Sequence, residues 1–435
     1  MKPGPIHFFF ATIVVSTLAL LPQYSLAETW LRCGQVLDVE NGRLNGPATL
    51  QIVDDRIAAI VDGQPEASDG IILIDLSELT CLPGLMDMHT HLTFESSPTR
   101  YVERFTKNEA DVALKSTEYA RKTLMAGFTT VRDLGDAFNA SIALRNAINN
   151  GVIVGPRIYT SGKSLATTGG HADPTNGWRA DLMGDPGPHE GVLNGVAEAR
   201  AAVRQRYKDG ADLIKITATG GVLSVAKNGL NPQFTEQEVA AVIETAADYD
   251  MHVAAHAHGI EGMRRAIEAG IHSIEHGTMM NEEIMQLMIE REVWYVPTIL
   301  AGNFVAEKAE IEGFYPEVIR PKARLIGPLI QATFGRAHAA GVKIAFGTDC
   351  GVCYHGDNAR EFALMVEAGM SEADALRSAT INTSKLLGIE DNAGTLETGK
   401  WADVIAVAGN PLEQIDTLNN MQFVMKAGHV YRLLE

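Results

Sequence analysis

Two histidines separated by a single residue, His89 and His91, end an apolar run that begins at Leu85. In an extended strand, residues i and i+2 point to the same side, so both imidazoles would project in the same direction. Neutral imidazole is a common ligand of zinc and related divalent ions. Because this spacing also arises by chance, its meaning depends on the other polar residues that end apolar runs.

Three later apolar runs also end in residues that bind metals. The run "HVAAHAHG" carries His256 and His258, the run "HSIEHG" carries His276, and "FGTD" ends in Asp349. Each of these side chains lies where a predicted strand stops. The histidines that precede the same strands belong to their opposite ends, and we predict that they are structural. These are His252 and His272.

Lys215 lies inside the apolar segment 212–216, where strand alternation buries it whichever face it occupies. A buried ammonium without a counter-charge is costly, or its pKa shifts strongly. One interpretation pairs Lys215 with a carboxylate elsewhere in the chain. The other is an amine that has reacted with carbon dioxide, giving a carbamate whose two oxygens bridge two metal ions.

Taken together, these residues suit two divalent, zinc-like ions. The predicted ligands are His89, His91, Lys215 as its carbamate, His256, His276 and Asp349. Such ions lower the pKa of a water molecule, and Asp349 would accept its proton and pass it to the leaving group.

Three further histidines are candidates for catalysis or substrate binding. His258 would steady the oxyanion or bind a substrate carboxylate. His171, in "TTGGH", and His355, in the loop after the eighth predicted strand, would bind substrate. For His171 the alternative is a hydrogen bond that orders its loop.

The elements that must position these residues alternate between strands and helices over residues 83–391. This pattern predicts an α/β domain of the (β/α)8 TIM-barrel type, with its active site at the carboxyl ends of the strands. A doubly wound open sheet is the alternative, but no glycine-rich phosphate-binding motif follows any strand. The eight predicted strands are Leu85–His89, Thr129–Asp133, Arg157–Thr160, Leu213–Ile216, His252–His256, Ser273–His276, Trp294–Pro297 and Ile344–Thr348.

Short apolar runs separated by turn signals occupy both ends of the remaining chain, residues 28–82 and 392–435. Because both segments share this alternation of short apolar runs and turns, we predict that they form one small discontinuous β-sandwich. The alternative is two unrelated extensions. Cys33 and Cys81 flank the first segment, and the sequence leaves their pairing open. The CxxC pair of Cys350 and Cys353 is incidental or at most a local disulfide, because it lacks the helix context of a redox motif.

Residues 1–27 have the pattern of a signal peptide: a lysine, an apolar run and a small-x-small cleavage site. We therefore expect export to the periplasm or the medium, with no membrane attachment after cleavage. An uncleaved anchor is the alternative. The net charge of −18 and the lack of basic runs argue against binding to nucleic acid.

Several of these motifs occur together in one known group of enzymes. The chain resembles the amidohydrolase superfamily, in its imidazolonepropionase-like and Xaa-Pro dipeptidase-like branch. That branch contains binuclear zinc carboxypeptidases and ochratoxin-hydrolysing amidohydrolases. Cys350 departs from the small apolar residue expected after the strand-eight aspartate. The motifs that carry the resemblance are "LPGLMDMHTHL", "GFTTVRDLG", "GADLIKI", "HAHG", "HSIEHG" and "GTDCGV".

The resemblance implies a division of the ligands between two zinc ions. His89, His91 and Asp349 would hold the more buried ion, and His256 and His276 the other, with carboxylated Lys215 between them. It also implies a homo-oligomer, an octamer by analogy.

The expected reaction is hydrolysis of the amide bond to a C-terminal amino acid, in an N-acyl amino acid, a dipeptide or ochratoxin A. Hydrolysis of a cyclic amide, a lactone or a phosphoester on the same site is an alternative. A deaminase fits less well, because such enzymes lack the bridging lysine. A non-catalytic scaffold would lack ligands, and none is missing here.

Overall fold

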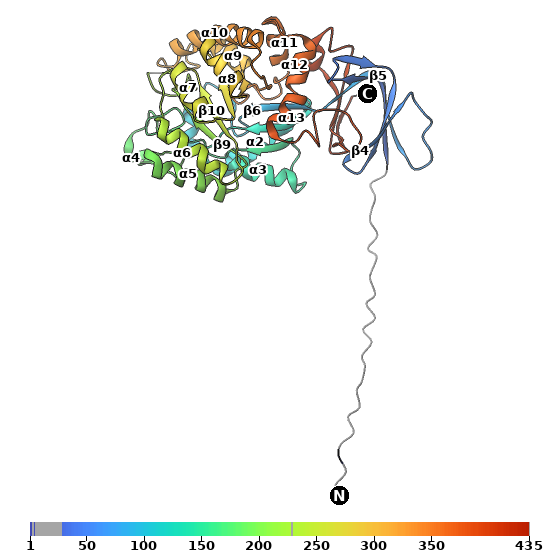
Figure 1. Ribbon diagram of the computed structural model, residues 1–435, viewed down its shortest axis with the longest axis horizontal. Helices are drawn as coiled ribbons and strands as arrows, with labels where there is room; N and C mark the ends of the chain where they lie inside the picture. Colours follow the sequence, from blue (N-terminus) through green and yellow to red (C-terminus); the bar gives the residue numbers. More distant parts are fainter. Residues whose placement is uncertain (2–3, 5–27, 228, 435) are drawn as a thin grey trace.

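A computed structural model describes residues 1, 4, 28–227 and 229–434. The predicted signal peptide, residues 1–27, therefore lies almost wholly outside the described residues. Two parallel sheets surrounded by helices form the larger part of the molecule, and a mainly antiparallel sheet adjoins them on one side (Figure 1). Within the described ranges, no helix has both the length and the apolar character needed to cross a membrane.

Both ends of the chain contribute to one eight-stranded sheet, in the order β15-β14-β13-β5-β1-β3-β4 with β2 paired to β1. Leu31 and Leu50, on neighbouring strands, are fully buried in its core. The predicted β-sandwich stays a prediction, because the hydrogen bonds define one sheet and not two packed layers. Its strands are β1 (Thr29–Asp38), β2 (Arg43–Asn45), β3 (Ala48–Val53), β4 (Arg56–Asp62), β5 (Ile72–Pro83), β13 (Val404–Ala408), β14 (Met421–Lys426) and β15 (His429–Leu433).

Seven parallel strands form the two sheets that carry the site, one in the order β6-β7-β8 and the other β12-β11-β10-β9. An isolated parallel bridge joins Leu165, in the segment that follows β8, to Ile216 of β9. The arrangement is of the TIM-barrel type. The strands are β6 (Leu85–Thr90), β7 (Phe128–Asp133), β8 (Arg157–Thr160), β9 (Ile214–Thr217), β10 (Val253–Ala257), β11 (Ser273–His276) and β12 (Trp294–Val296).

The eighth predicted strand, residues 344–348, forms no regular ladder. Ile344 makes an isolated parallel bridge to Tyr295, and Phe346 accepts a hydrogen bond of 2.9 Å from the Met88 amide. The amide of Phe346, however, donates to the Ser378 carbonyl at 3.0 Å. Because its donors and acceptors are divided among different elements, the segment lies in the strand position without the hydrogen-bond pattern of a strand.

Helices cover the outside of the parallel sheets, and glycines end two of them. Gly210 and Gly341 adopt φ of +93° and +87°, the left-handed conformation that favours glycine. The helices are α1 (Arg100–Thr106), α2 (Glu109–Met125), α3 (Ala140–Asn149), α4 (Ala180–Met183), α5 (Gly195–Asp209), α6 (Glu236–Ala247), α7 (Ile260–Glu268), α8 (Glu282–Glu290), α9 (Ile299–Lys308), α10 (Arg320–Ala340), α11 (Arg360–Glu367), α12 (Glu372–Ser378) and α13 (Ile381–Leu387), and a 3-10 helix, η1 (Ile415–Asn419), precedes β14.

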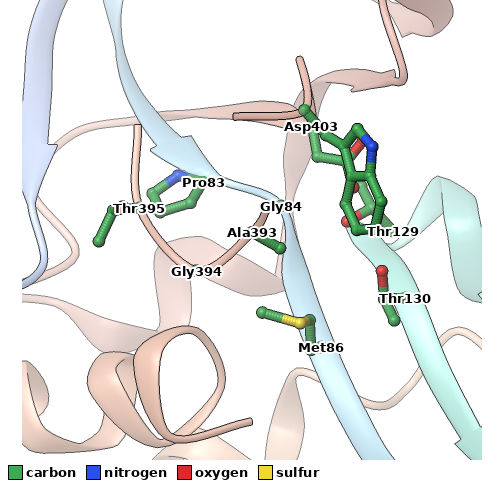
Figure 2. Close-up of a pocket in the computed structure, with 10 residues that line it drawn as sticks. Pro83, Gly84, Met86, Thr129, Thr130, Ala393, Gly394, Thr395 and Asp403 are labelled. Atoms are coloured by element: carbon green, nitrogen blue, oxygen red, sulfur yellow. The ribbon is translucent and has the colours of Figure 1, made fainter. Parts of the chain in front are cut away.

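The large sheet meets the barrel-type unit at the amino ends of the parallel strands. There Arg157 pairs with Asp403 at 2.8 Å and stacks 3.7 Å above the Trp401 ring. Figure 2 shows the small pocket at this junction, lined by residues that include Met86 and Thr129 from the beginnings of β6 and β7. This junction lies at the opposite end of the strands from the predicted ligands.

Both cysteine pairs form disulfides, and Cys33–Cys81 joins β1 to β5 within the large sheet. It closes a loop over a sequence separation of 48 residues. We predict that C33S/C81S lowers the free energy of unfolding by about 2–4 kcal/mol, because a long loop regains conformational entropy in the unfolded chain. Thermal denaturation under non-reducing conditions measures this. An unchanged melting temperature, with two thiols titrated in denatured wild type, would show that the bond does not form.

Candidate active site

The six predicted metal ligands lie together at the carboxyl ends of the parallel strands. The ring centroids of His89 and His91 are 5.4 Å apart, and that of His276 is 5.0 Å from His89. His256 lies 4.6 Å from His276, and the Lys215 Nζ is 3.4 Å from the His89 Nε2. Asp349 completes the cluster.

Asp349 directs a carboxylate oxygen at the Nε2 atoms of His91 and His89, at 3.1 and 3.4 Å. The other ring nitrogen of each histidine is already occupied: the Nδ1 of His91 donates to the Gly135 carbonyl at 2.9 Å, and that of His89 to Glu275 at 2.9 Å. In the neutral rings these contacts place the proton on Nδ1, so each Nε2 presents a lone pair to the carboxylate.

Asp349 Oδ1 is buried and has no hydrogen-bond partner among the described residues. An anion that faces two lone pairs in a buried site is the donor set of a divalent cation. The residues present therefore fit a metal ion, since one ligand atom from each of the three lies within 4.8 Å of the other two.

The histidines on β10 and β11 are also fixed through one ring nitrogen each. His256 Nε2 donates to the Gly220 carbonyl at 3.1 Å, and His276 Nδ1 lies 2.7 Å from the Thr298 hydroxyl. Burial lowers the pKa of both rings well below its usual value. Both are therefore neutral near pH 7, which is the form that binds metals.

Lys215 is 4% exposed, and in the described part of the chain it forms no ion pair with a carboxylate. Burial is the largest influence on its ammonium and lowers its pKa to about 8, although Glu275 and Asp349 act in the opposite direction. The expectation of a directly paired lysine therefore finds no support in the geometry.

The three predicted substrate residues occupy different places. His258 lies within the cluster, with its ring 4.6 Å from that of His256 and its Nδ1 2.8 Å from the Thr278 hydroxyl. His171 stacks on His256 at 4.4 Å, and its buried Nδ1 has no partner among the described residues. His355 instead donates to the Phe94 carbonyl at 2.8 Å, which fits a role in positioning the loop after β6.

Two of the polar strand ends have a left-handed backbone. His276 and Asp349 adopt φ of +72° and +58°, and Thr298, which holds His276, adopts +56°. Such conformations cost about 1–3 kcal/mol each for residues other than glycine and persist where the surroundings enforce them. Three of the eight non-glycine residues with positive φ in the described chain lie at this cluster.

Sequence reasoning missed a buried ion pair that supports His89. Glu275 accepts hydrogen bonds from His89 Nδ1 at 2.9 Å and from Arg132 at 2.8 Å, and both charged residues are fully buried. Burial raises the pKa of Glu275, but Arg132 and then His89 lower it to about 2. A signal existed, because opposite charges lie inside two strands predicted to be buried.

The predicted structural histidines lie at the other end of the strands. His252 and His272 stack on each other at 4.0 Å, and His272 Nε2 bonds to the Leu386 carbonyl at 3.0 Å. Neither ring makes a contact with the cluster among the described residues, which fits their predicted role.

Comparison with known proteins identifies the family. Residues 80–433 match the amidohydrolase family. The chain belongs to this family. The amidohydrolase is 32% identical to ochratoxinase of Aspergillus niger over 402 residues, which cover 88% of this chain and 82% of that protein.

Two solved structures extend the comparison. One is a Xaa-Pro dipeptidase with methionine bound in its active site, 52% identical with a TM-score of 0.91, covering 93% of this chain and 100% of that one. The other is a prolidase complexed with N-methylphosphonate-L-proline, 30% identical with a TM-score of 0.85, covering 94% and 100%. The amidohydrolase thus belongs to the dipeptidase-like branch that its motifs resemble.

The Glu275–Arg132 pair yields a stability prediction. E275Q leaves the buried Arg132 guanidinium without its counter-charge, so we expect it to lower the free energy of unfolding by roughly 3–5 kcal/mol. Chemical denaturation followed by circular dichroism measures this change. The matched control is E268Q, which makes the same substitution on an exposed position of α7. Equal stability of the two variants would contradict a structural role for the pair.

Proposed function

We propose that this amidohydrolase is a binuclear metal-dependent enzyme that hydrolyses the amide bond to a C-terminal amino acid. Its substrates would be N-acyl amino acids or dipeptides, with ochratoxin A, which releases phenylalanine, among them. The observation that carries the proposal is the buried Asp349 carboxylate facing the lone pairs of His89 and His91. The ochratoxinase and dipeptidase relatives support the substrate class.

The ligands would divide between two zinc-like ions. His89, His91 and Asp349 would hold one ion and His256 and His276 the other, and Lys215 would bridge them as a carbamate. When bound, the two ions polarise the scissile carbonyl and lower the pKa of a water molecule.

The carbamate follows from the environment of Lys215. With its pKa lowered to about 8, a useful fraction of the amine is neutral near pH 7 and free to react with carbon dioxide. The reaction joins the amine nitrogen to the carbon of carbon dioxide and releases one proton. Counted from the ammonium form, which first loses a proton to become the amine, two protons leave and a buried cation becomes an anion, which suits a site that would hold metal ions.

The remaining steps belong to the protein's own side chains. Asp349 would take a proton from the attacking water and deliver it to the leaving amine. His258 and His171 lie beside His256 and would steady the developing oxyanion or the substrate. The His171 ring packs directly against the backbone of Gly221. A Cβ added at Gly221 would lie 2.3 Å from that ring.

Export and assembly belong to the same proposal. We infer that residues 1–27 are a signal peptide, because all four cysteines of the chain form disulfides, as is usual in oxidising compartments. We also infer that residues 344–348 complete a closed eight-membered barrel through their bridges to neighbouring strands. A homo-oligomer, octameric by analogy, stays a prediction.

A panel of amides tests the substrate class. We expect hydrolysis of N-acetyl-L-amino acids, of dipeptides and of ochratoxin A, with loss of activity in a chelator and recovery with Zn²⁺. Release of the free amino acid, followed by chromatography, is the measurement. Turnover of only cyclic amides, lactones or phosphoesters would replace the proposed substrate class, and turnover of nothing, without bound metal, would favour a non-catalytic scaffold.

Replacing Lys215 tests the bridging ligand. K215A should reduce the metal content from about two ions per chain and lower kcat by at least 100-fold, because both ions lose a shared anion. The metal is measured by mass spectrometry. A short carboxylate such as propionate should restore part of the activity. The control K343A removes an exposed lysine that pairs with Glu292. Full activity and metal content in K215A would refute the carbamate.

A further inference from the structure

Arg100 lies beside the proposed metal site without an acidic partner. Its guanidinium carbon is 3.8 Å from the centre of the Phe94 ring, and Phe94 stacks on His91 at 5.1 Å. One aromatic ring therefore connects it to a proposed ligand. In the described ranges, the Arg100 guanidinium forms no ion pair and donates no hydrogen bond, although the residue is only partly exposed. A half-buried cation of this kind is costly unless something binds to it.

Two buried hydroxyls lie in the same place. Ser96 and Tyr315 are 3% and 5% exposed, and neither hydroxyl has a hydrogen-bond partner of ordinary geometry in the part of the chain that the structure describes. Tyr315 belongs to the apolar cluster that packs against Phe94, the ring over which Arg100 lies, and its hydroxyl is within interaction range of Arg100 and Ser96. Burial raises the pKa of Tyr315, so it keeps its proton and can donate it in a hydrogen bond.

These groups come from two loops that the fold brings to the same end of the strands. Ser96 and Arg100 follow β6, and Tyr315 lies between α9 and α10. The Tyr101 hydroxyl donates to the Leu223 carbonyl at 3.1 Å and so fixes the start of α1 against a third loop. The three groups thus offer hydrogen-bond donors on a fixed framework, and none of them is a carboxylate that could neutralise Arg100.

The surroundings indicate what this donor cluster binds. An apolar cluster that includes Tyr315, Phe304 and Phe314 packs against Phe94. An amino acid carries its carboxylate and its side chain on the same carbon, so a ligand carboxylate here would place an apolar side chain against these rings. A planar guanidinium matches the two oxygens of a carboxylate.

We propose that Arg100, with the hydroxyls of Tyr315 and Ser96, binds the free carboxylate of the substrate's C-terminal residue. This inference rests on the proposed function and adds its specificity: the enzyme would select amides of free amino acids over amides without a carboxylate. The competing explanation is that Arg100 only stacks on Phe94, a contact that does not distinguish substrates.

The test compares two amides that differ only in the carboxylate, N-acetyl-L-methionine and N-acetyl-3-(methylthio)propylamine. R100A should lower kcat/KM for N-acetyl-L-methionine by roughly 10- to 100-fold, mainly through KM, because a hydrogen bond to a charged group is lost. For the uncharged amide, kcat/KM should stay within about three-fold of wild type. This substrate lacks the carboxylate that Arg100 would bind, so removing the guanidinium takes away no further interaction. Y315F should show the same pattern with a smaller effect.

The control R104A removes an arginine one turn further along α1, whose guanidinium lies 6.0 Å from the Tyr101 ring. It should leave both substrates unaffected. Inhibition by L-methionine provides a second measurement, since its inhibition constant should rise in R100A and not in R104A. Equal losses for both substrates in R100A, or an unchanged KM, would overturn the proposal.

Failure of this inference is distinguishable from failure of the proposed function. If wild type hydrolyses neither the methionine derivative nor the wider panel, the proposed function fails. If wild type hydrolyses N-acetyl-L-methionine and R100A does so equally well, only the carboxylate site fails. Should R100A not fold, judged by circular dichroism, Y315F removes a single hydroxyl and decides the question by the same substrate comparison.

Discussion

The site depends on an electrostatic conflict that the fold must hold in place. Asp349 faces the unprotonated nitrogens of His89 and His91 at 3.1–3.4 Å, where no hydrogen bond relieves the repulsion. A cation between them would turn the repulsion into binding energy. Until one binds, the surrounding protein must hold the three groups there. The buried Glu275–Arg132 pair does this for His89, because Glu275 fixes both the proton and the orientation of the ring.

A second line of support reaches His276 from the outer helices. Its Nδ1 is held by Thr298, the residue that begins α9 and adopts a left-handed backbone. The first amides of that helix donate to the Glu361 carboxyl of α11 at 2.8 and 2.6 Å. Burial raises the pKa of Glu361 to about 8, although these two amides lower it, so the carboxyl is mainly neutral near pH 7. Thus an uncharged buried group anchors the helix start that orients a proposed ligand.

Much of this arrangement was predictable from periodicity. Seven of the eight predicted strands form within a residue or so of their expected bounds, because apolar β-branched runs between glycine stops define buried parallel strands. Residues 344–348 differ, since their hydrogen bonds go to several partners and to the Asp87 carboxylate. A single sequence contains no information about such shared hydrogen bonds.

The predicted ligands converge for the same reason, because strand ends meet at one end of a parallel barrel. The supporting residues were harder to find. Glu275 directly precedes a proposed ligand within the same motif, whereas its partner Arg132 lies more than a hundred residues earlier. Arg100 and Tyr315 come from loops, whose course depends on tertiary contacts and not on periodicity. Their proximity became visible only in three dimensions.

One loop connects the proposed metal site to the proposed carboxylate site. The Cys350 carbonyl accepts from the His91 amide at 2.7 Å, and the next carbonyl, of Gly351, accepts from the Ser96 amide at 2.7 Å. Gly351 has φ of +112°, and an added Cβ would lie 2.7 Å from that of His91, so only glycine allows this approach.

The Cys350–Cys353 disulfide closes the same loop directly after Asp349. The cysteine that departs from the family pattern is therefore a cross-link beside a proposed ligand and not a free thiol. Because one short, cross-linked segment holds His91, Asp349 and Ser96, the proposed metal site and the proposed carboxylate site are held at a fixed separation. Under the proposed function, such a separation would select substrates by the distance between their scissile amide and their carboxylate.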